Sequence, residues 1–295
     1  MDTKKATLCV LGAGVLWGCI SLFANIMTAA GMTSFQISGV RMIVSTVGMA
    51  LVVFLTDRSK FRIRIRDIWM FVGTGFVSLT LFNICYFACM QMSEVSVAVV
   101  LLYTSPVWVM LMSAVVFRER ITPKKLAALV MTFVGCALVA GIVGGAVQLT
   151  PIALVVGVAG GVFYALYSIF GNVALKSYDT MTVTFWTFAI GAVASLFISD
   201  HAGTVAIAAS QPSLWLVFLG IGVLCTIVPF LLYTLGLKHM EAGRAAILAT
   251  AEPLVGSLLG IFAYGESASP VKIIGMFLIL ASVILLNVGD KKPAE

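Results

Sequence analysis

Charged side chains are the scarcest feature of this sequence. They make up 10% of its residues, whereas soluble domains carry about 25%. The fifty residues between Lys125 and Lys176 contain no charge at all. An ionised group in hydrocarbon costs roughly 2.5–3.5 kcal/mol, and one membrane-spanning helix needs about 20 apolar residues. The run therefore indicates two spans joined by a turn, and the overall deficit excludes a large soluble domain.

Histidine is also scarce, and no aspartate lies inside an apolar segment. The only histidines, His201 and His239, lie at the edges of such segments. An intramembrane hydrolase or metalloenzyme would need a Ser/His pair, a zinc motif or paired aspartates within the spans. The six cysteines all lie in apolar stretches, which argues against a disulfide framework. We expect no enzyme, no cofactor and no metal site.

Apolar length is what the sequence has in abundance. Charges and turn residues divide the chain into ten segments, and in lipid each must be a helix because a lone strand leaves its backbone groups without hydrogen bonds. The expected spans are 6–30, 33–56, 68–92, 95–117, 124–141, 152–175, 180–199, 212–237, 243–264 and 271–289. The predicted fold class is an all-α polytopic membrane protein with ten transmembrane helices.

Basic residues fix the orientation. An even number of spans puts both termini on one side, and placing that side in the cytoplasm puts all but two of the 18 Lys and Arg residues there. The exceptions are Lys272, outside, and Arg41, within a span. The positive-inside rule thus predicts a multi-pass protein of the cell (inner/cytoplasmic) membrane with both termini cytoplasmic. The net charge of +6 is then a topology signal, and we expect a lipid bilayer but no nucleic acid as partner.

The sequence matches itself at a constant shift of 147 residues. The shift pairs Ser21 with Ser168, Asn25 with Asn172, Tyr86 with Tyr233, Pro106 with Pro253 and Glu119 with Glu266. It indicates an internal repeat of five helices, with repeats at 6–142 and 152–289. Because five is odd, the second copy enters the membrane inverted, which is typical of secondary transporters.

Several short motifs in order resemble the EamA-type transporters of the drug/metabolite transporter superfamily. They are Leu16-Trp17-Gly18, Arg41, Tyr103-Thr104-Ser105-Pro106, Glu119-Arg120, Ala251-Glu252-Pro253 and Tyr264-Gly265-Glu266. Phe117-Arg118-Glu119 departs from the family pattern, which usually has Gly before this Glu. The resemblance implies ten helices in two inverted repeats, a central cavity, and peripheral fifth and tenth helices. It also implies small-metabolite substrates, often amino acids, nucleosides or amines, and frequent export.

Two charged residues lie deep in expected spans. Glu252 lies near the middle of the ninth, where a carboxylate is costly unless paired. It attracts a cationic or zwitterionic substrate, takes up a coupling proton, or forms a fixed structural pair. Arg41 in the second span anchors a substrate carboxylate or forms a gating salt bridge with Glu252. The alternatives for Arg41 are a permanent pair and an extension toward the outer interface.

Prolines and aromatic residues extend the candidate site. Pro106, Pro229 and Pro253 each free a backbone carbonyl, and such backbone is tolerated where it lines a cavity; a packed kink is the alternative. Aromatic rings around Glu252 can hold an ammonium group through cation–π contacts, with lipid-facing packing as the alternative. The candidate substrate-binding residues are Trp17, Asn25, Arg41, Asn83, Tyr86, Tyr103, Tyr164, Trp186, Tyr233 and Glu252.

The expected function is secondary transport of a small polar metabolite by alternating access. An amino acid or organic amine, exported, is favoured; a nucleoside, sugar-like or quaternary-ammonium solute, or import, is the alternative. Proton coupling and the choice between monomer and homodimer are left open. A channel or scaffold would need a filter loop or extended soluble segments, which are absent from the sequence. Glu119 and Glu266 lie at equivalent helix–loop junctions, where capping is expected and a gate role is the alternative.

Overall fold

The computed structural model describes residues 1–142 and 150–287, and the regular structure within them is helical, with no strand. The first repeat contains α1 (Thr3–Gly18), α2 (Ile20–Ala29), α3 (Ser34–Thr56), α4 (Ile68–Val72), the π-helix η3 (Gly73–Thr80), α5 (Leu81–Met92), α6 (Val95–Leu102), α7 (Ser105–Val116) and α8 (Pro123–Val139). Two short 3₁₀ turns, η1 (Arg58–Phe61) and η2 (Ile65–Asp67), precede α4.

The second repeat follows the same order. It contains α9 (Pro151–Leu175), α10 (Thr180–Ile198), α11 (His201–Ser210), α12 (Leu214–Gly222), the π-helix η4 (Val223–Ile227), α13 (Val228–Leu237), α14 (Ala242–Ala249), α15 (Ala251–Tyr264) and α16 (Pro270–Asn287). The ends predicted at residue 289 for the last span and the second repeat lie outside the described residues.

Helix starts follow local capping chemistry. Thr33 and Gln36 form a reciprocal capping box at the start of α3, which satisfies two otherwise unpaired donors. The side chains of Thr122 and Thr150 accept hydrogen bonds at the starts of α8 and α9, and proline occupies the first turn of both helices. Proline suits this position because its missing N–H would have no partner there.

Nine helical stretches within the described residues are long and apolar enough to cross a membrane. The remaining segment, α8, has 17 residues, which is about 26 Å at 1.5 Å per residue and shorter than a hydrocarbon core of about 30 Å. The all-α membrane fold is confirmed, whereas the count of ten spans stays a prediction.

The short helix α11 was not predicted. Residues 200–211 lie between two expected spans, and ten helical residues are too few to produce a spanning signal. Asp200 caps α11 by accepting a 2.8 Å hydrogen bond from the Gly203 N–H. The Gln36 amide donates to the Asp200 carbonyl at 3.2 Å and so ties this corner to α3.

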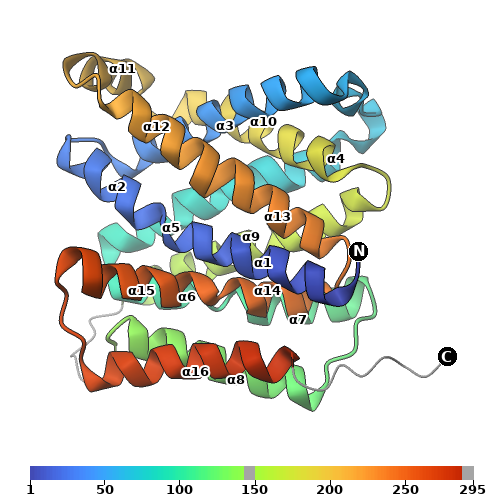
Figure 1. Cartoon of the computed structure of the whole chain (residues 1–295), viewed down its shortest axis with the longest axis vertical. Helices are drawn as coiled ribbons and strands as arrows, with labels where there is room; N and C mark the ends of the chain where they lie inside the picture. Colours follow the sequence, from blue (N-terminus) through green and yellow to red (C-terminus); the bar gives the residue numbers. More distant parts are fainter. Residues whose placement is uncertain (143–149, 288–295) are drawn as a thin grey trace.

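The two ends of the bundle differ in charge, and we name them accordingly. At the basic face, to the right in Figure 1, α1 and α14 begin and α3 ends. At the opposite face, to the left, α2 and α15 end and α6 begins. The loops of the basic face carry Arg58, Lys60, Arg62, Arg64, Arg66, Arg118, Arg120 and Lys176, whereas Lys272 lies at the opposite face.

The inverted repeat is visible in the helix irregularities. Residues 76–80 of η3 and 223–227 of η4 are both π-helical and are 147 positions apart. The fourth span breaks after Leu102 and its counterpart breaks after Ala249, at the same offset. Since α6 starts at the opposite face and α14 at the basic face, the two copies run in opposite directions (Figure 1). The predicted inverted arrangement is therefore confirmed.

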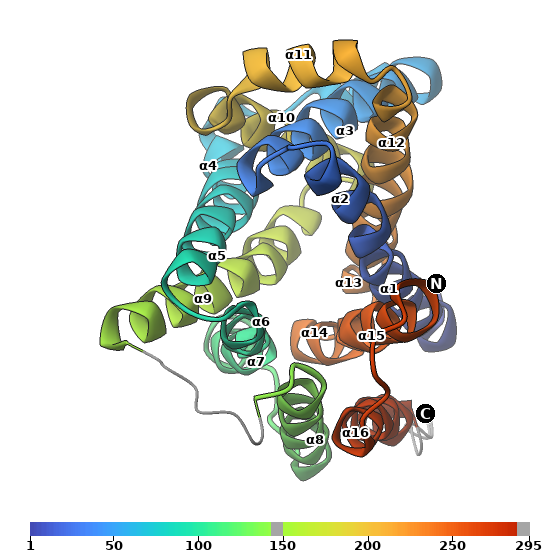
Figure 2. The same cartoon turned by 90° about the vertical axis from the view of Figure 1, so that its left-hand side faces the viewer.

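The last helices of the two repeats, α8 and α16, pack side by side at one edge of the molecule (Figure 2). A Cβ on Gly135 would lie 2.8 Å from the Gly275 carbonyl oxygen, so the backbones are in direct contact. The hydroxyls of Thr132 and Ser282 add a 2.7 Å hydrogen bond across this contact. The fifth helices are thus peripheral, as the resemblance implied.

Candidate functional site

The breaks in the fourth and ninth spans are held by two equivalent glycines. A Cβ on Gly14 of α1 would lie 2.9 Å from the Ala249 carbonyl oxygen. A Cβ on Gly161 of α9 would lie 2.8 Å from the Leu101 carbonyl oxygen. Such close approach requires glycine. It brings α1 against the α14–α15 break and α9 against the α6–α7 break.

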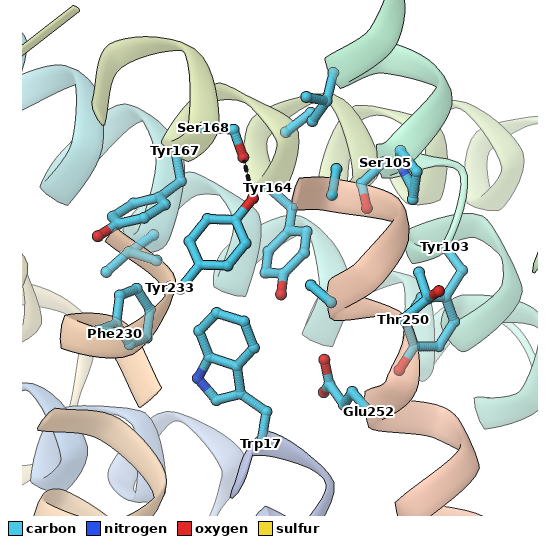
Figure 3. A pocket seen from close by; sticks show the side chains of 16 residues that line it. Trp17, Tyr103, Ser105, Tyr164, Tyr167, Ser168, Phe230, Tyr233, Thr250 and Glu252 are labelled. Carbon is cyan, nitrogen blue, oxygen red and sulfur yellow. Dashed lines mark hydrogen bonds between the residues drawn. The ribbon is translucent and has the colours of Figure 1, made fainter. Parts of the chain in front are cut away.

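One turn beyond each glycine an aromatic side chain enters the space between the repeats. Trp17 and Tyr164 are 147 positions apart, and both line a cavity of about 510 Å³, measured out to its open mouth. Figure 3 shows the hydroxyl end of Tyr164 pointing toward the Glu252 carboxylate, with the Trp17 ring beside it. The predicted residues that line it are Trp17, Tyr103, Tyr164, Tyr233 and Glu252.

Part of the wall is already hydrogen-bonded within the protein. The Tyr233 hydroxyl is 2.7 Å from the Ser168 hydroxyl (Figure 3), and the Tyr167 hydroxyl is 2.7 Å from Thr234 Oγ1. The Phe230 ring packs edge-on against Trp17 with centroids 5.2 Å apart. These side chains fix the shape of the cavity, because their polar groups are satisfied and their rings are packed.

Five other polar groups in the cavity have no protein partner. Within the described residues, no hydrogen bond or ion pair reaches the Glu252 carboxylate, the hydroxyls of Tyr103, Ser105 and Tyr164, or the indole N–H of Trp17. Glu252 also lies within electrostatic range of both tyrosines. A charged carboxylate at this depth without compensation is costly, which makes these groups the candidates for contact with a solute.

Arg41 lies near this group but does not line the cavity. Its Nε donates a 3.2 Å hydrogen bond to Thr226 Oγ1 in η4, and its charge acts on Glu252 and Tyr164. No ion pair joins Arg41 to Glu252 in the part of the chain that the structure describes. The gating salt bridge considered for these residues is therefore not formed in this conformation.

Four other candidates do not line the cavity. Asn25 is exposed on α2, and the Asn83 amide donates to the Leu79 carbonyl within its own helix at 2.7 Å. Tyr86 packs against Phe82 with ring centroids 5.7 Å apart. The Trp186 indole donates to the Phe61 carbonyl at 3.2 Å, at the basic face. Their roles in binding stay predictions, without a place in the cavity wall.

Pro106, whose helix break indicated a cavity, is among the lining residues. Several other lining residues were not among the candidates. They are Leu79, Ser105, Val109, Ala165, Tyr167, Ser168, Phe230, Ala246, Ala249 and Thr250. The internal repeat could have identified two of them. Ser105 is the repeat equivalent of the candidate Glu252, and Thr250 is the repeat equivalent of the candidate Tyr103. The small and apolar residues offer no such signal, since their composition does not distinguish a cavity wall from packing.

Comparison with known proteins assigns the family. The model of the EamA-like transporter family matches residues 4–141 and again residues 151–288. An uncharacterized transporter of Archaeoglobus fulgidus is 34% identical over 205 residues, covering 68% of this chain and 70% of the relative. The uncharacterized inner membrane transporter YicL of Salmonella typhimurium is 27% identical and covers 100% of this chain and 99% of its own length.

A solved structure supports the fold. One crystal structure superposes with a TM-score of 0.79 at 19% identity, covering 96% of each chain. At this identity the likeness concerns the fold alone. The family model, in contrast, matches nearly the whole sequence, once in each repeat. The chain therefore belongs to the EamA-like transporter family, and it is a multi-pass membrane transporter.

Proposed function

We propose that this transporter moves a small solute with a positively charged amine, an organic amine or an amino acid, by alternating access through the central cavity. The observation that carries the proposal is the Glu252 carboxylate, which has no hydrogen bond or ion pair among the described residues and lines the same cavity as the side chains of Trp17 and Tyr164 (Figure 3). An ammonium group would pair with the Glu252 carboxylate and could also make cation–π contacts with the aromatic rings.

The cavity suits such a solute in its chemistry. Most of the wall is aromatic or aliphatic, including Phe230, Val109 and Leu79. A few convergent polar groups in an apolar wall are the usual composition of a specific site. This composition favours an amine with an apolar body over a sugar-like solute.

Arg41 decides between an amine and an amino acid. A substrate carboxylate needs a cation, and Arg41 is the basic residue within electrostatic range of Glu252. It lies outside the present lining and donates to Thr226. An amino acid would therefore require the Arg41 guanidinium to turn toward the cavity, whereas a simple amine requires no rearrangement. A quaternary ammonium solute or a nucleoside is the alternative.

The remaining assignments belong to the same proposal. The basic face lies in the cytoplasm, because basic loops are retained there during insertion. Protonation of Glu252 would release a bound cation and couple its movement to a proton. The resemblance to the EamA-type family supports export.

A binding experiment with three related probes tests the proposal. Phenethylamine, phenylalanine and the neutral phenylethanol are added to the purified protein in detergent, and thermal unfolding is followed. A ligand at 100 times its dissociation constant adds about 2.7 kcal/mol of stability. We expect stabilisation by at least one of the two ammonium compounds and none by phenylethanol. Equal stabilisation by phenylethanol would contradict an ammonium site. Counterflow in proteoliposomes, measured with the ammonium compound that stabilises the protein, checks whether the bound solute is also transported.

A further inference from the structure

At the basic face, side-chain contacts join the two repeats. The Glu119 carboxylate accepts hydrogen bonds from the Ala242 N–H at 2.7 Å and the Gly243 N–H at 3.3 Å, at the start of α14. Next to it, Lys125 Nζ lies 2.5 Å from a Glu241 carboxylate oxygen. A carboxylate at a helix N-terminus is favoured by the helix dipole and the unpaired amides. These contacts form a latch, which we call the basic-face latch.

Every residue of the basic-face latch has an equivalent at the opposite face. A shift of 147 residues pairs Glu119 with Glu266, Lys125 with Lys272, Glu241 with Glu94, Ala242 with Val95 and Gly243 with Ser96. All three charged residues keep their identity. The opposite face therefore contains the carboxylate, the ion pair and the free helix start that a second latch requires.

The backbone that carries the two carboxylates is also equivalent. The Glu119 N–H donates to the Ser113 carbonyl at 3.3 Å, and the Glu266 N–H donates to the Gly260 carbonyl at 3.0 Å. Ser113 and Gly260 are themselves 147 positions apart. The two loops thus share this backbone hydrogen bond, whereas their carboxylates have different partners.

At the opposite face these residues are not assembled into a latch. Glu266 pairs instead with Lys272 of its own repeat at 2.6 Å. Among the described residues, the Glu94 carboxylate accepts one long hydrogen bond, from Ser96 Oγ at 3.4 Å, and no side chain caps α6. The charged groups are present but are paired within the repeat rather than between repeats.

Packing shows the same asymmetry. Six residues of α13 are buried, whereas its equivalent α5 has one buried residue, Cys89. Six residues of α14 are buried, against three of α6. Figure 2 views the molecule from the opposite face, where α2, α5, α6 and α15 surround the centre. The helices α13 and α14, which meet at the basic face, are thus more buried than their equivalents α5 and α6 at the opposite face.

We propose that Glu94, Glu266 and Lys272 form a second latch that closes the opposite face in the alternate conformation of the transporter. There Glu266 accepts hydrogen bonds from the amides of Val95 and Ser96, and Lys272 leaves Glu266 to pair with Glu94. The inference rests on the proposed alternating access, because exchanging the conformations of two inverted repeats converts each contact into its equivalent at the other face. Lys272 exchanges Glu266 for Glu94 as its ion-pair partner, so the change of conformation leaves the number of ion pairs the same.

Two exposed acids make the test selective. Glu241 is paired only in the present conformation, whereas the proposal pairs Glu94 only in the alternate one. Glu241→Gln therefore weakens the closed basic face, and Glu94→Gln weakens the closed opposite face. Both side chains lie on exposed positions at helix starts, so neither change disturbs the core. Asp200→Asn is the matched control, because it removes one negative charge from the opposite face and Asn keeps the capping ability.

Hydrogen–deuterium exchange of the purified full-length protein reports both faces without a substrate. For Glu241→Gln we expect deuterium uptake in α14 to rise and uptake in α6 to fall. In the double variant with Glu241→Gln and Glu94→Gln, deuterium uptake in α14 and in α6 should return toward the wild-type values. In the double variant with Glu241→Gln and Asp200→Asn it should not.

The outcomes separate the two proposals. If Glu241→Gln shifts uptake but adding Glu94→Gln changes it no more than adding Asp200→Asn, the second latch is wrong while alternation stands. If Glu241→Gln leaves α6 and α14 unchanged, the exchange of conformations is itself wrong and the latch fails with it.

Discussion

Ser105 and Glu252 stand at the same position of the two repeats, and both line the central cavity. Only one of them carries a charge. Exchange of the repeat conformations therefore preserves the shape of the cavity, whereas its one carboxylate stays on the second repeat. A cation bound at Glu252 would be carried by α15 in both conformations.

Replacing Glu252 by Gln should abolish binding and transport of ammonium solutes. The amide keeps the size of the side chain but removes the charge that pairs with the cation. The affinity for phenethylamine should therefore fall at least tenfold, which corresponds to about 1.4 kcal/mol of binding free energy. Thermal shift and counterflow measure it. Ser105→Ala, at the equivalent position of the cavity wall, removes an uncharged hydroxyl and should weaken binding of the amine less than Glu252→Gln does. Normal transport by Glu252→Gln would remove the anchor role.

Two tyrosines of the same wall should respond differently to loss of their hydroxyl. Tyr233→Phe leaves the buried Ser168 hydroxyl without its 2.7 Å partner, which should cost about 1–3 kcal/mol of folding stability. Tyr164→Phe removes a hydroxyl that has no protein partner, so stability should hold and solute affinity should change. Denaturation and binding measured on both variants distinguish the roles. Adding Ser168→Ala to Tyr233→Phe should recover part of the stability, because no buried group is then left unpaired.

Arg118 is the single non-glycine residue with a left-handed backbone in the described ranges, with φ of 58°. Its equivalent in the second repeat, Gly265, has φ of 67°. The left-handed conformation costs a residue with a Cβ about 1–2 kcal/mol, so Arg118→Gly should stabilise the protein by up to about 1 kcal/mol after the entropy of the unfolded glycine is counted. Arg120→Gly removes the same charge from the same loop without relieving strain and should destabilise. A lower melting temperature for Arg118→Gly would contradict the assigned geometry.

The contact between α8 and α16 should not tolerate a side chain at Gly135. A Cβ there would lie 2.8 Å from the Gly275 carbonyl oxygen, and backbone cannot move aside as a flexible side chain can. Gly135→Val should therefore lower stability by about 1–3 kcal/mol and raise protease sensitivity at this edge. Gly256→Ala is the matched control, because the nearest atom to its Cβ would be 3.9 Å away, and it should be tolerated.

Hydropathy and the repeat were sufficient to predict the helical segments and their inverted arrangement. Most observed ends lie within a few residues of the prediction, because charges such as Arg58 and Lys176 and prolines such as Pro123 mark where the chain leaves the apolar layer. The helix α11 was missed because it does not span. The π-helical segments η3 and η4 were missed because Gly73 and Pro229 signal irregularity without specifying its type.

The cavity could be predicted only in part. Motifs at helix breaks identified Tyr103 and Glu252, and the repeat paired Trp17 with Tyr164. The sequence did not separate these from Asn83, Tyr86 and Trp186, because it does not fix how each helix is rotated about its own axis. Helix rotation is set by contacts such as that of Gly161 with Leu101, which involve residues distant in the chain.

The seam between α8 and α16 has a further experimental use. It joins one helix from each copy through Thr132 and Ser282 and lies at one edge of the molecule (Figure 2). Spin labels on the lipid-facing sides of these two helices should hold one constant separation through every stage of turnover. The pair would then serve as an internal ruler, against which displacements elsewhere in the molecule are calibrated.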